Sequence, residues 1–221
     1  MYIKSFDLTL VTIIIAFILS CSWVNTKNQV YVDYHDNEWG RYSASCSETV
    51  LFEFLNLEGA QAGLSWEVIL KKREAYALAF DGWDVKKIAA YDDIKVNELM
   101  GNAGIVRNRQ KIKAVITNAQ AYLELCKDED CRSLNHYIHS FLPDGKPIIN
   151  DGKTRIATSP ISDALSKDLK KRHFKFVGTT IIYAYLQALG FVNDHDEHCY
   201  LKSDVCSTTT VPVCPTINTI M

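Results

Sequence analysis

The sequence lacks an excess of charge of either sign, and it lacks a long apolar run. Its 24 Lys and Arg residues nearly balance 26 Asp and Glu residues, so contact with nucleic acid would require a local basic patch. The longest apolar run, residues 8–19, is shorter than the ~20 residues that a membrane-spanning helix needs. We interpret residues 1–20 as a hydrophobic N-terminal extension, typical of a signal peptide or of an over-called gene start.

The cysteine and proline patterns limit the fold further. The seven cysteines are odd in number and irregularly spaced, which does not indicate a disulfide framework, although a few of them could bind metal. Three of the five prolines fall within residues 142–160 and predict a loop there. Residues 203–221 are rich in Ser, Thr and Pro and predict a disordered tail, which leaves residues 21–202 as one domain.

Strand-like alternation is nearly absent, and helical periodicity dominates the remaining sequence. Apolar residues at helical spacing predict helices over residues 50–63, 66–80, 85–91, 94–100, 110–126, 162–172 and 179–189. The residues expected to begin helices are Ser47, Ser65, Asp84, either Asp92 or Asp93, and Ser162. The sequence therefore predicts an all-α fold with short connections.

Six ordered runs carry a family resemblance: YHDNEWG (34–40), LEGAQAGLSW (57–66), LKKREAYALAF (70–80), AGIVRNRQKI (103–112), SDALSKDLKKRHFKFVGTT (162–180) and GFVNDHDEHC (190–199). From residue 21 to about 200 the chain resembles the 3-methyladenine DNA glycosylase I family, a branch of the helix-hairpin-helix glycosylases. The resemblance implies a helix-hairpin-helix fold and a DNA repair enzyme. Such an enzyme flips 3-methyladenine out of DNA and hydrolyses its N-glycosidic bond, leaving an abasic site.

The resemblance also implies one structural zinc ion that joins the N- and C-terminal ends of the domain. Its ligands would be Cys21, His35, His195 and Cys199. Two thiolates and two imidazoles form a closed tetrahedral set, with no open position for catalysis. His198 is expected to face solvent instead. A lipidated Cys21 could not bind zinc as a thiolate, so an exported, lipid-anchored protein is a competing interpretation, and we favour zinc.

The base pocket that the resemblance implies consists of Trp23, Tyr34, Glu58 and Trp66. Trp66 would stack on the flipped base, Tyr34 and Glu58 would hydrogen-bond its edge, and Trp23 would close one wall. Glu58, Tyr34 and Trp66 are therefore the catalytic candidates. Aromatic faces attract a cationic base, and a carboxylate in an apolar helix is costly to bury without a partner. Trp39 is expected only to pack beneath the metal-binding loop.

The family lacks the catalytic aspartate of most helix-hairpin-helix glycosylases, and Asn193 stands at that position here. A cationic base leaves as a neutral molecule, so we expect binding and orientation to supply most of the catalysis. Glu58 then acts mainly as a selector and electrostatic stabiliser. Asp194 could be a second acid or could orient a zinc-binding histidine, and the sequence leaves both open. No lysine occupies the usual lyase position, so strand cleavage is not expected.

A hairpin at residues 174–178 is expected to point backbone N–H groups at DNA phosphates. The DNA-binding candidates are Lys170, Lys171, Arg172, Lys175, Phe176, Gly178 and Thr179. The family usually has glycine in place of His173, so His173 either adopts a left-handed conformation at a cost or shifts the turn. A second basic run, residues 107–113, is either a solvated helix face or a second DNA contact.

These residues predict a monomer that acts on double-stranded DNA containing alkylated adenine. We expect it in the cytoplasm, associated with the nucleoid and without a stable membrane partner. The main alternative is a catalytically inactive, zinc-stapled DNA-binding protein, against which the presence of all four pocket residues argues. Two further hypotheses are an exported zinc protein, which depends only on residues 1–20, and a glycosylase with altered base preference.

Overall fold

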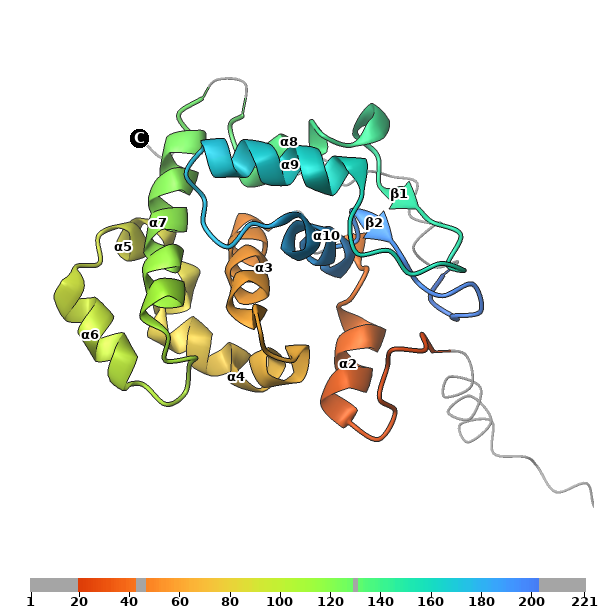
Figure 1. The fold of residues 1–221 in the computed structure, drawn as a ribbon, viewed down its shortest axis with the longest axis horizontal. Helices are drawn as coiled ribbons and strands as arrows, with labels where there is room; N and C mark the ends of the chain where they lie inside the picture. Colours follow the sequence, from red (N-terminus) through yellow and green to blue (C-terminus); the bar gives the residue numbers. More distant parts are fainter. Residues whose placement is uncertain (1–19, 43–46, 129–130, 203–221) are drawn as a thin grey trace, which may run out of the picture.

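The computed structural model describes residues 20–42, 47–128 and 131–202, and this part of the chain is mostly helical (Figure 1). The extension at residues 1–19 and the tail at 203–221 lie outside the described residues. The helices are α2 (Gln29–Asn37), α3 (Glu48–Gln61), α4 (Trp66–Ala79), α5 (Val85–Ala89), α6 (Asp93–Gly101), α7 (Arg109–Leu125), α8 (Leu134–His139), α9 (Pro160–Lys171) and α10 (Thr179–Ala188). Short 3₁₀ turns lie at Asp81–Trp83 and Pro143–Gly145. No helix in the described ranges is long and apolar enough to cross a membrane.

Helix α3 is the central element of the fold. Every residue from Leu51 to Ala60 is buried, because α3 contacts α4, α7, α8 and α10 on different sides. Figure 1 shows α3 between α7 and α10. One apolar cluster joins α3 to α8, α9 and α10, and a second joins it to α4, α5, α6 and α7. The sequence predicts an apolar stripe on one side of this helix, but α3 is buried on several sides. Two of its buried residues are the acids Glu53 and Glu58.

Most of the predicted helix starts are confirmed. The side chains of Ser47, Asp84 and Asp92 each accept a backbone hydrogen bond from the first turn of the helix that follows. Ser65 precedes α4 but makes no capping bond. The predicted start at Ser162 is wrong, because Ser159 is the N-cap: its hydroxyl accepts from the Ser162 amide, and the Ser162 hydroxyl accepts from the Ser159 amide. Pro160, at the first helical position, needs no amide partner and so extends the helix backwards.

The strictly all-α prediction needs one correction. Within the predicted loop at 142–160, β1 (Ile148–Ile149) pairs in parallel with β2 (Val192–Asn193). The register places Ile148 opposite Val192 and Ile149 opposite Asn193. This short pairing holds the chain before α9 beside the chain after α10.

The connection between α9 and α10 is a tight loop over residues 172–178. Its start is a Schellman turn: the amide of Phe174 donates to the carbonyl of Leu169, and the amide of His173 donates to that of Lys170. His173 occupies the left-handed position of this turn, with φ of 70°. Of the two outcomes left open by the sequence, the histidine takes the left-handed conformation and the helix ends there.

Candidate functional site

One cavity of about 350 Å³ contains all four predicted pocket residues in its lining. Tyr34 comes from α2, Glu58 from α3 and Trp66 from the first position of α4, while Trp23 comes from the segment before α2. The remaining wall comes from the loop at residues 152–156, from α10 and from the segment after β2. Residues far apart in the sequence are thus brought into one site.

Aromatic rings form the inner surface of this cavity. The Tyr34 and Trp66 ring centroids are 5.6 Å apart, and those of Trp23 and Tyr34 are 6.4 Å apart. The buried indole N–H of Trp23 has no hydrogen-bond acceptor among the described residues, and that of Trp66 lies beside the Tyr34 hydroxyl. Such a surface suits a flat, electron-poor ligand that offers acceptors at its edge.

Glu58 is the buried acid of the site. Its side chain is almost fully buried, and the described residues provide no hydrogen bond or ion pair to its carboxyl group. Burial alone raises the pKa of Glu58 to about 8. Burial also raises the pKa of Tyr34, helped by the charge of Glu58, so its hydroxyl stays neutral. A cation entering the cavity would find in Glu58 a carboxyl group that has no other partner.

Several lining residues were not identified from the sequence. Tyr31 lies one helical turn before Tyr34, and this spacing could have identified it. Trp39 both lines the cavity and packs 4.6 Å from the His195 ring, so the packing role expected for it is only part of its position. Arg155 comes from a loop without any sequence signal.

Asp194 also lines the cavity and is fully hydrogen-bonded. It accepts from Asn150 at 2.5 Å, from the Tyr183 hydroxyl at 2.7 Å and from Gln187 at 2.6 Å. The orienting role toward a histidine belongs instead to Asn193, whose Oδ1 accepts from Nδ1 of His195 at 3.0 Å. Asp194 therefore faces the cavity as a carboxylate held by three donors.

The four predicted metal ligands form one buried cluster beside the cavity. One ligand atom from each of Cys21, His35, His195 and Cys199 lies within 4.8 Å of the others. In both histidines Nδ1 faces an oxygen acceptor, Asp36 for His35 and Asn193 for His195, which leaves Nε2 to face the cluster.

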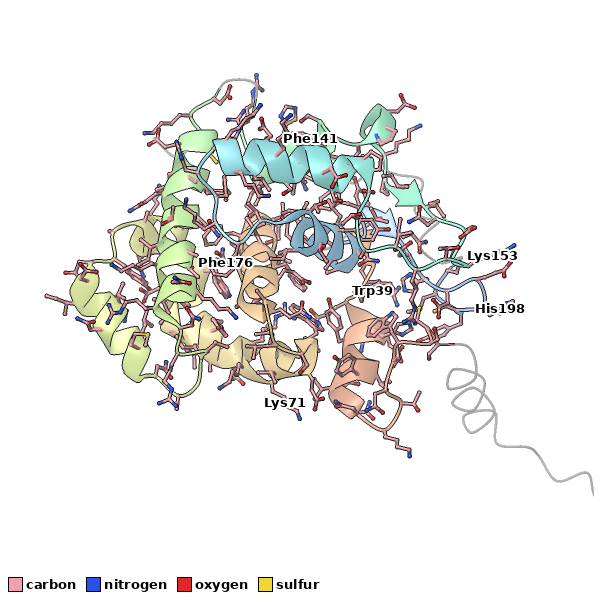
Figure 2. All side chains as sticks on the ribbon, in the orientation of Figure 1. Trp39, Lys71, Phe141, Lys153, Phe176 and His198 are labelled. Carbon is pink, nitrogen blue, oxygen red and sulfur yellow. The ribbon has the colours of Figure 1, made fainter. Side chains whose placement is uncertain are left out.

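The chemistry of this donor set fits a zinc ion. Nε2 of His195 is buried without a partner, and burial lowers the pKa of this imidazole to about 3, so it is neutral as a ligand must be. Gly40 is required beside it, since a Cβ there would lie 2.5 Å from the His195 ring. His198 is exposed, as predicted, and lies at the outer end of the molecule (Figure 2).

The predicted DNA-binding residues divide into exposed and internally bound groups. Lys170, Lys171 and Lys175 are exposed on or beside the 172–178 loop. Arg172 instead pairs with Asp168 at 2.9 Å and Asp128 at 3.4 Å, with its guanidinium 5.3 Å from the Tyr137 ring centroid.

The other predicted residues of this loop lie at its end. The hydroxyl of Thr179 donates to Asp163 at 2.5 Å, and Gly178 is the N-cap of α10. Phe176 lies against Gly59 and lines a groove next to α7 (Figure 2).

The second basic run is largely engaged within the protein. Lys111 donates to the carbonyls of Ala60 and Ala62, both at 2.7 Å, and so caps the C-terminal end of α3. Lys113 pairs with Asp93 at 2.8 Å, and Arg109 donates to Asn97 at 2.6 Å. These contacts favour a structural role for the run over a second DNA contact.

Comparisons with known proteins agree on one family. The sequence profile of a family described as methyladenine glycosylase matches residues 23–202. The chain is 43% identical over 187 residues to DNA-3-methyladenine glycosylase of Haemophilus influenzae, covering 83% of this chain and 97% of that protein. It is 46% identical over 182 residues to DNA-3-methyladenine glycosylase 1 of Escherichia coli K12, covering 81% and 94%.

Solved structures give the same answer. A crystal structure of a 3-methyladenine DNA glycosylase I superposes with a TM-score of 0.77 at 45% identity, covering 82% of this chain and 98% of that one. The Staphylococcus aureus enzyme, described for its recognition of 3-methyladenine, gives a TM-score of 0.77 at 35% identity, covering 83% and 96%. A Tyr→Phe variant described in complex with 3-methyladenine gives 0.76 at 34% identity, covering 83% and 97%.

Proposed function

The chain belongs to the methyladenine glycosylase family and is a 3-methyladenine DNA glycosylase, and we propose that the cavity lined by Trp23, Tyr34, Glu58 and Trp66 is its base pocket. One observation carries this assignment. Five aromatic residues and a buried carboxyl group, to which the described residues offer no partner, converge on a single cavity. The alternative of an inactive zinc-stapled protein is not favoured, because this cavity is open and keeps every pocket residue.

Within this proposal, the pocket recognises the charge of the damaged base. A 3-methylated adenine in DNA is cationic, so besides stacking it gains an electrostatic attraction to aromatic faces that neutral adenine lacks. Trp66 and Tyr34 provide these faces, and the Glu58 carboxylate offsets the positive charge. Because Glu58 has no other partner, its ionised form is stabilised only when a cation enters. Selectivity then follows from charge as well as from shape.

Catalysis requires little beyond binding and orientation. Water adds to the sugar carbon while the bond to the base nitrogen breaks, and the electron pair of that bond neutralises the base. The departing 3-methyladenine is neutral, and the water loses one proton. Glu58 and Asp194 both line the pocket, and as carboxylates they would stabilise the positive charge that develops on the sugar as the bond to the base breaks. The product is an abasic site, without strand cleavage.

Further elements of the proposal concern zinc, DNA and cellular context. Cys21, His35, His195 and Cys199 would hold a structural zinc ion that cross-links the ends of the domain. The helix–loop–helix unit of α9 and α10 would serve as the helix-hairpin-helix, with Lys170, Lys171 and Lys175 near the phosphates of double-stranded DNA. We propose a monomer that acts in the cytoplasm at the nucleoid.

The test is release of 3-methyladenine from methylated duplex DNA. We expect Glu58→Ala and Trp66→Ala to reduce the single-turnover rate by roughly 10²-fold, the loss typical of removing an electrostatic stabiliser from a catalytic site. Glu124→Ala is the matched control, since Glu124 is an exposed glutamate on α7 that pairs with the exposed Lys127, away from the cavity lining. Folded Glu58→Ala protein with the wild-type rate would exclude Glu58 from the site.

A further inference from the structure

Arg73 connects the three helices that each contribute one pocket residue. It lies on α4, seven residues after Trp66 and therefore on nearly the same helix face. Its guanidinium binds Glu53 of α3, with Nε donating to Oε1 at 2.7 Å and Nη2 lying 3.5 Å from Oε2. Nη1 donates to Glu38, the residue that ends α2.

Each of these carboxylates lies close in sequence to a pocket residue. The amide of Glu38 donates to the carbonyl of Tyr34 at 3.0 Å, so the two residues share the last turn of α2. Glu53 is five positions before Glu58 on α3. The charges of Arg73 and Glu38 both act on the Tyr34 hydroxyl, which places the ion pairs near the cavity.

A second contact connects Arg73, through Phe54, to the ring of Trp66. The guanidinium carbon lies 4.9 Å from the ring centroid of Phe54, and Phe54 lies 6.4 Å from the Trp66 ring at 34° between the planes. Phe54 is also one helical turn before Glu58, on the same face of α3. Arg73 thus supports Trp66 through Phe54 as well as through its own helix.

We propose that Arg73 is a positioning residue. By clamping α2 and α3 to α4, it holds Tyr34, Glu58 and Trp66 in the relative positions that binding of the base requires. The proposal rests on the base pocket proposed above. Arg73 does not itself line that pocket, so it acts only through the residues that do.

The neighbouring basic residues show why arginine is needed at this position. Lys71 pairs with Glu67 on its own helix, and Lys72 donates to the carbonyl of Ala103. Only Arg73 of these three binds two other helices. A planar guanidinium can hold two carboxylates at fixed angles, whereas the ammonium of lysine is a flexible point charge. We therefore expect lysine to restore the clamp only in part.

The experiment compares Arg73→Met, Arg73→Lys and the control Lys71→Met. Lys71 lies on the same helix and points outward from it (Figure 2), so its substitution removes an equal charge without touching the clamp. All variants are measured at a temperature where circular dichroism shows each to be folded. The readouts are the Kd for free 3-methyladenine, kcat and KM for base release, and the Kd for undamaged duplex DNA.

We expect Arg73→Met to weaken binding of the free base at least tenfold and to lower kcat, with Arg73→Lys between it and wild type. Lys71→Met should match wild type, and affinity for undamaged DNA should not change in any variant. Should Arg73→Met fail to fold, Glu53→Gln and Glu38→Gln each remove half of the clamp at constant volume, and each should weaken base binding several-fold.

The result that overturns the clamp is distinct from the result that overturns the pocket. Wild-type base affinity in folded Arg73→Met, beside a clear loss in Trp66→Ala, would show that the pocket exists and that Arg73 does not position it. Wild-type base affinity in both variants would contradict both proposals, the base pocket and the positioning role of Arg73. A loss confined to undamaged DNA would mean that Arg73 contacts phosphate, and the proposal would be wrong.

Discussion

At the scale of single residues, Glu58 shows a conflict between stability and activity. Burial raises its pKa from an ordinary 4.5 to about 8, so the folded protein keeps a proton that the unfolded chain releases between those pH values. The unfolded state therefore binds fewer protons in this window, and stability falls as the pH rises through it. A residue so costly at the centre of the fold is accounted for by its proposed contact with the substrate.

We predict that Glu58→Gln raises stability by about 2 kcal/mol at pH 8 and by clearly less at pH 5, because glutamine carries no ionisable proton. Tyr34, Arg155, Asp194 and Asp196 also face the cavity but are present in both proteins, so the difference between the two isolates Glu58. Denaturant unfolding at both pH values measures it. An equal stability gain at pH 5 and pH 8 would show that Glu58 is not buried as an acid.

His173 is a second costly residue, because its type does not suit its backbone conformation. It occupies the left-handed position that ends α9, where glycine is favoured because a Cβ is strained there. We predict that His173→Gly stabilises the protein by about 0.5–1 kcal/mol, the left-handed strain relieved less the extra chain entropy of glycine. Thermal unfolding measures the gain, and His198→Gly, in an exposed segment outside the helices, is the comparison. A lower Tm for His173→Gly would mean that the imidazole stabilises the turn.

The site could be predicted from the sequence only where the family resemblance already implied a role for a residue. Trp23, Tyr34, Glu58 and Trp66 were assigned through the family resemblance, and the structure places them in one cavity. Arg73 falls within the run at residues 70–80, but its proposed role could not be predicted, because that role depends on partners on two other helices. Arg172 was expected on DNA, yet Asp168 and Asp128 already bind it.

At the scale of elements, the loop between α9 and α10 is held in place by the buried side-chain amide of an asparagine on α7. Asn118 of α7 accepts from the Lys175 amide at 2.7 Å, and its Nδ2 lies 3.2 Å from the Lys175 carbonyl and 2.9 Å from Asn56. Asn118 is 2% exposed, and its bond to Asn56 is buried, while the two bonds to Lys175 are partly buried. The loop that we propose for DNA binding is thus fixed in position by the protein core.

We predict that Asn118→Ala costs about 2 kcal/mol, because it leaves the backbone N–H and carbonyl of Lys175 and the Asn56 side chain without their Asn118 partner. The looser loop should also weaken binding of undamaged duplex DNA several-fold, while the Kd for free 3-methyladenine stays unchanged. Asn56→Ala is the matched control, since it disturbs the same network without contacting the loop. DNA binding as tight as wild type in Asn118→Ala would show that the loop does not need this anchor.

Helix starts were the most predictable features at this scale, because a cap is a local interaction. Ser47, Asp84 and Asp92 each bind amides two or three positions ahead, and the sequence alone contains both partners. The prediction for the start of α9 was wrong because Ser159 and Ser162 form hydrogen bonds with each other, so either serine could be taken for the N-cap. The β1–β2 pair was missed because two-residue strands have too little alternation to be seen.

At the scale of the whole molecule, both ends of the described chain meet beside the cavity that we propose as the base pocket. Asp196 accepts from the amide and hydroxyl of Ser22, both at 2.5 Å, and the four proposed zinc ligands lie next to this contact. Trp23 follows Ser22 directly, and Asp194 and Asp196 also line the cavity. The closure of the domain and the wall of the pocket are therefore built from the same residues.

The last prediction concerns the ion that would secure this closure. We expect the purified protein to contain one zinc ion per chain, and His195→Ala to lose it, while His198→Ala keeps it because that imidazole is exposed. Closing a loop between Cys21 and Cys199 is worth about 5 kcal/mol in the chain-entropy treatment of a cross-link, so a strong chelator should lower Tm by roughly 10–20 °C. Elemental analysis and thermal unfolding measure both effects. A metal-free protein with unchanged Tm would show that hydrogen bonds such as that of Ser22 with Asp196 hold the ends together without an ion.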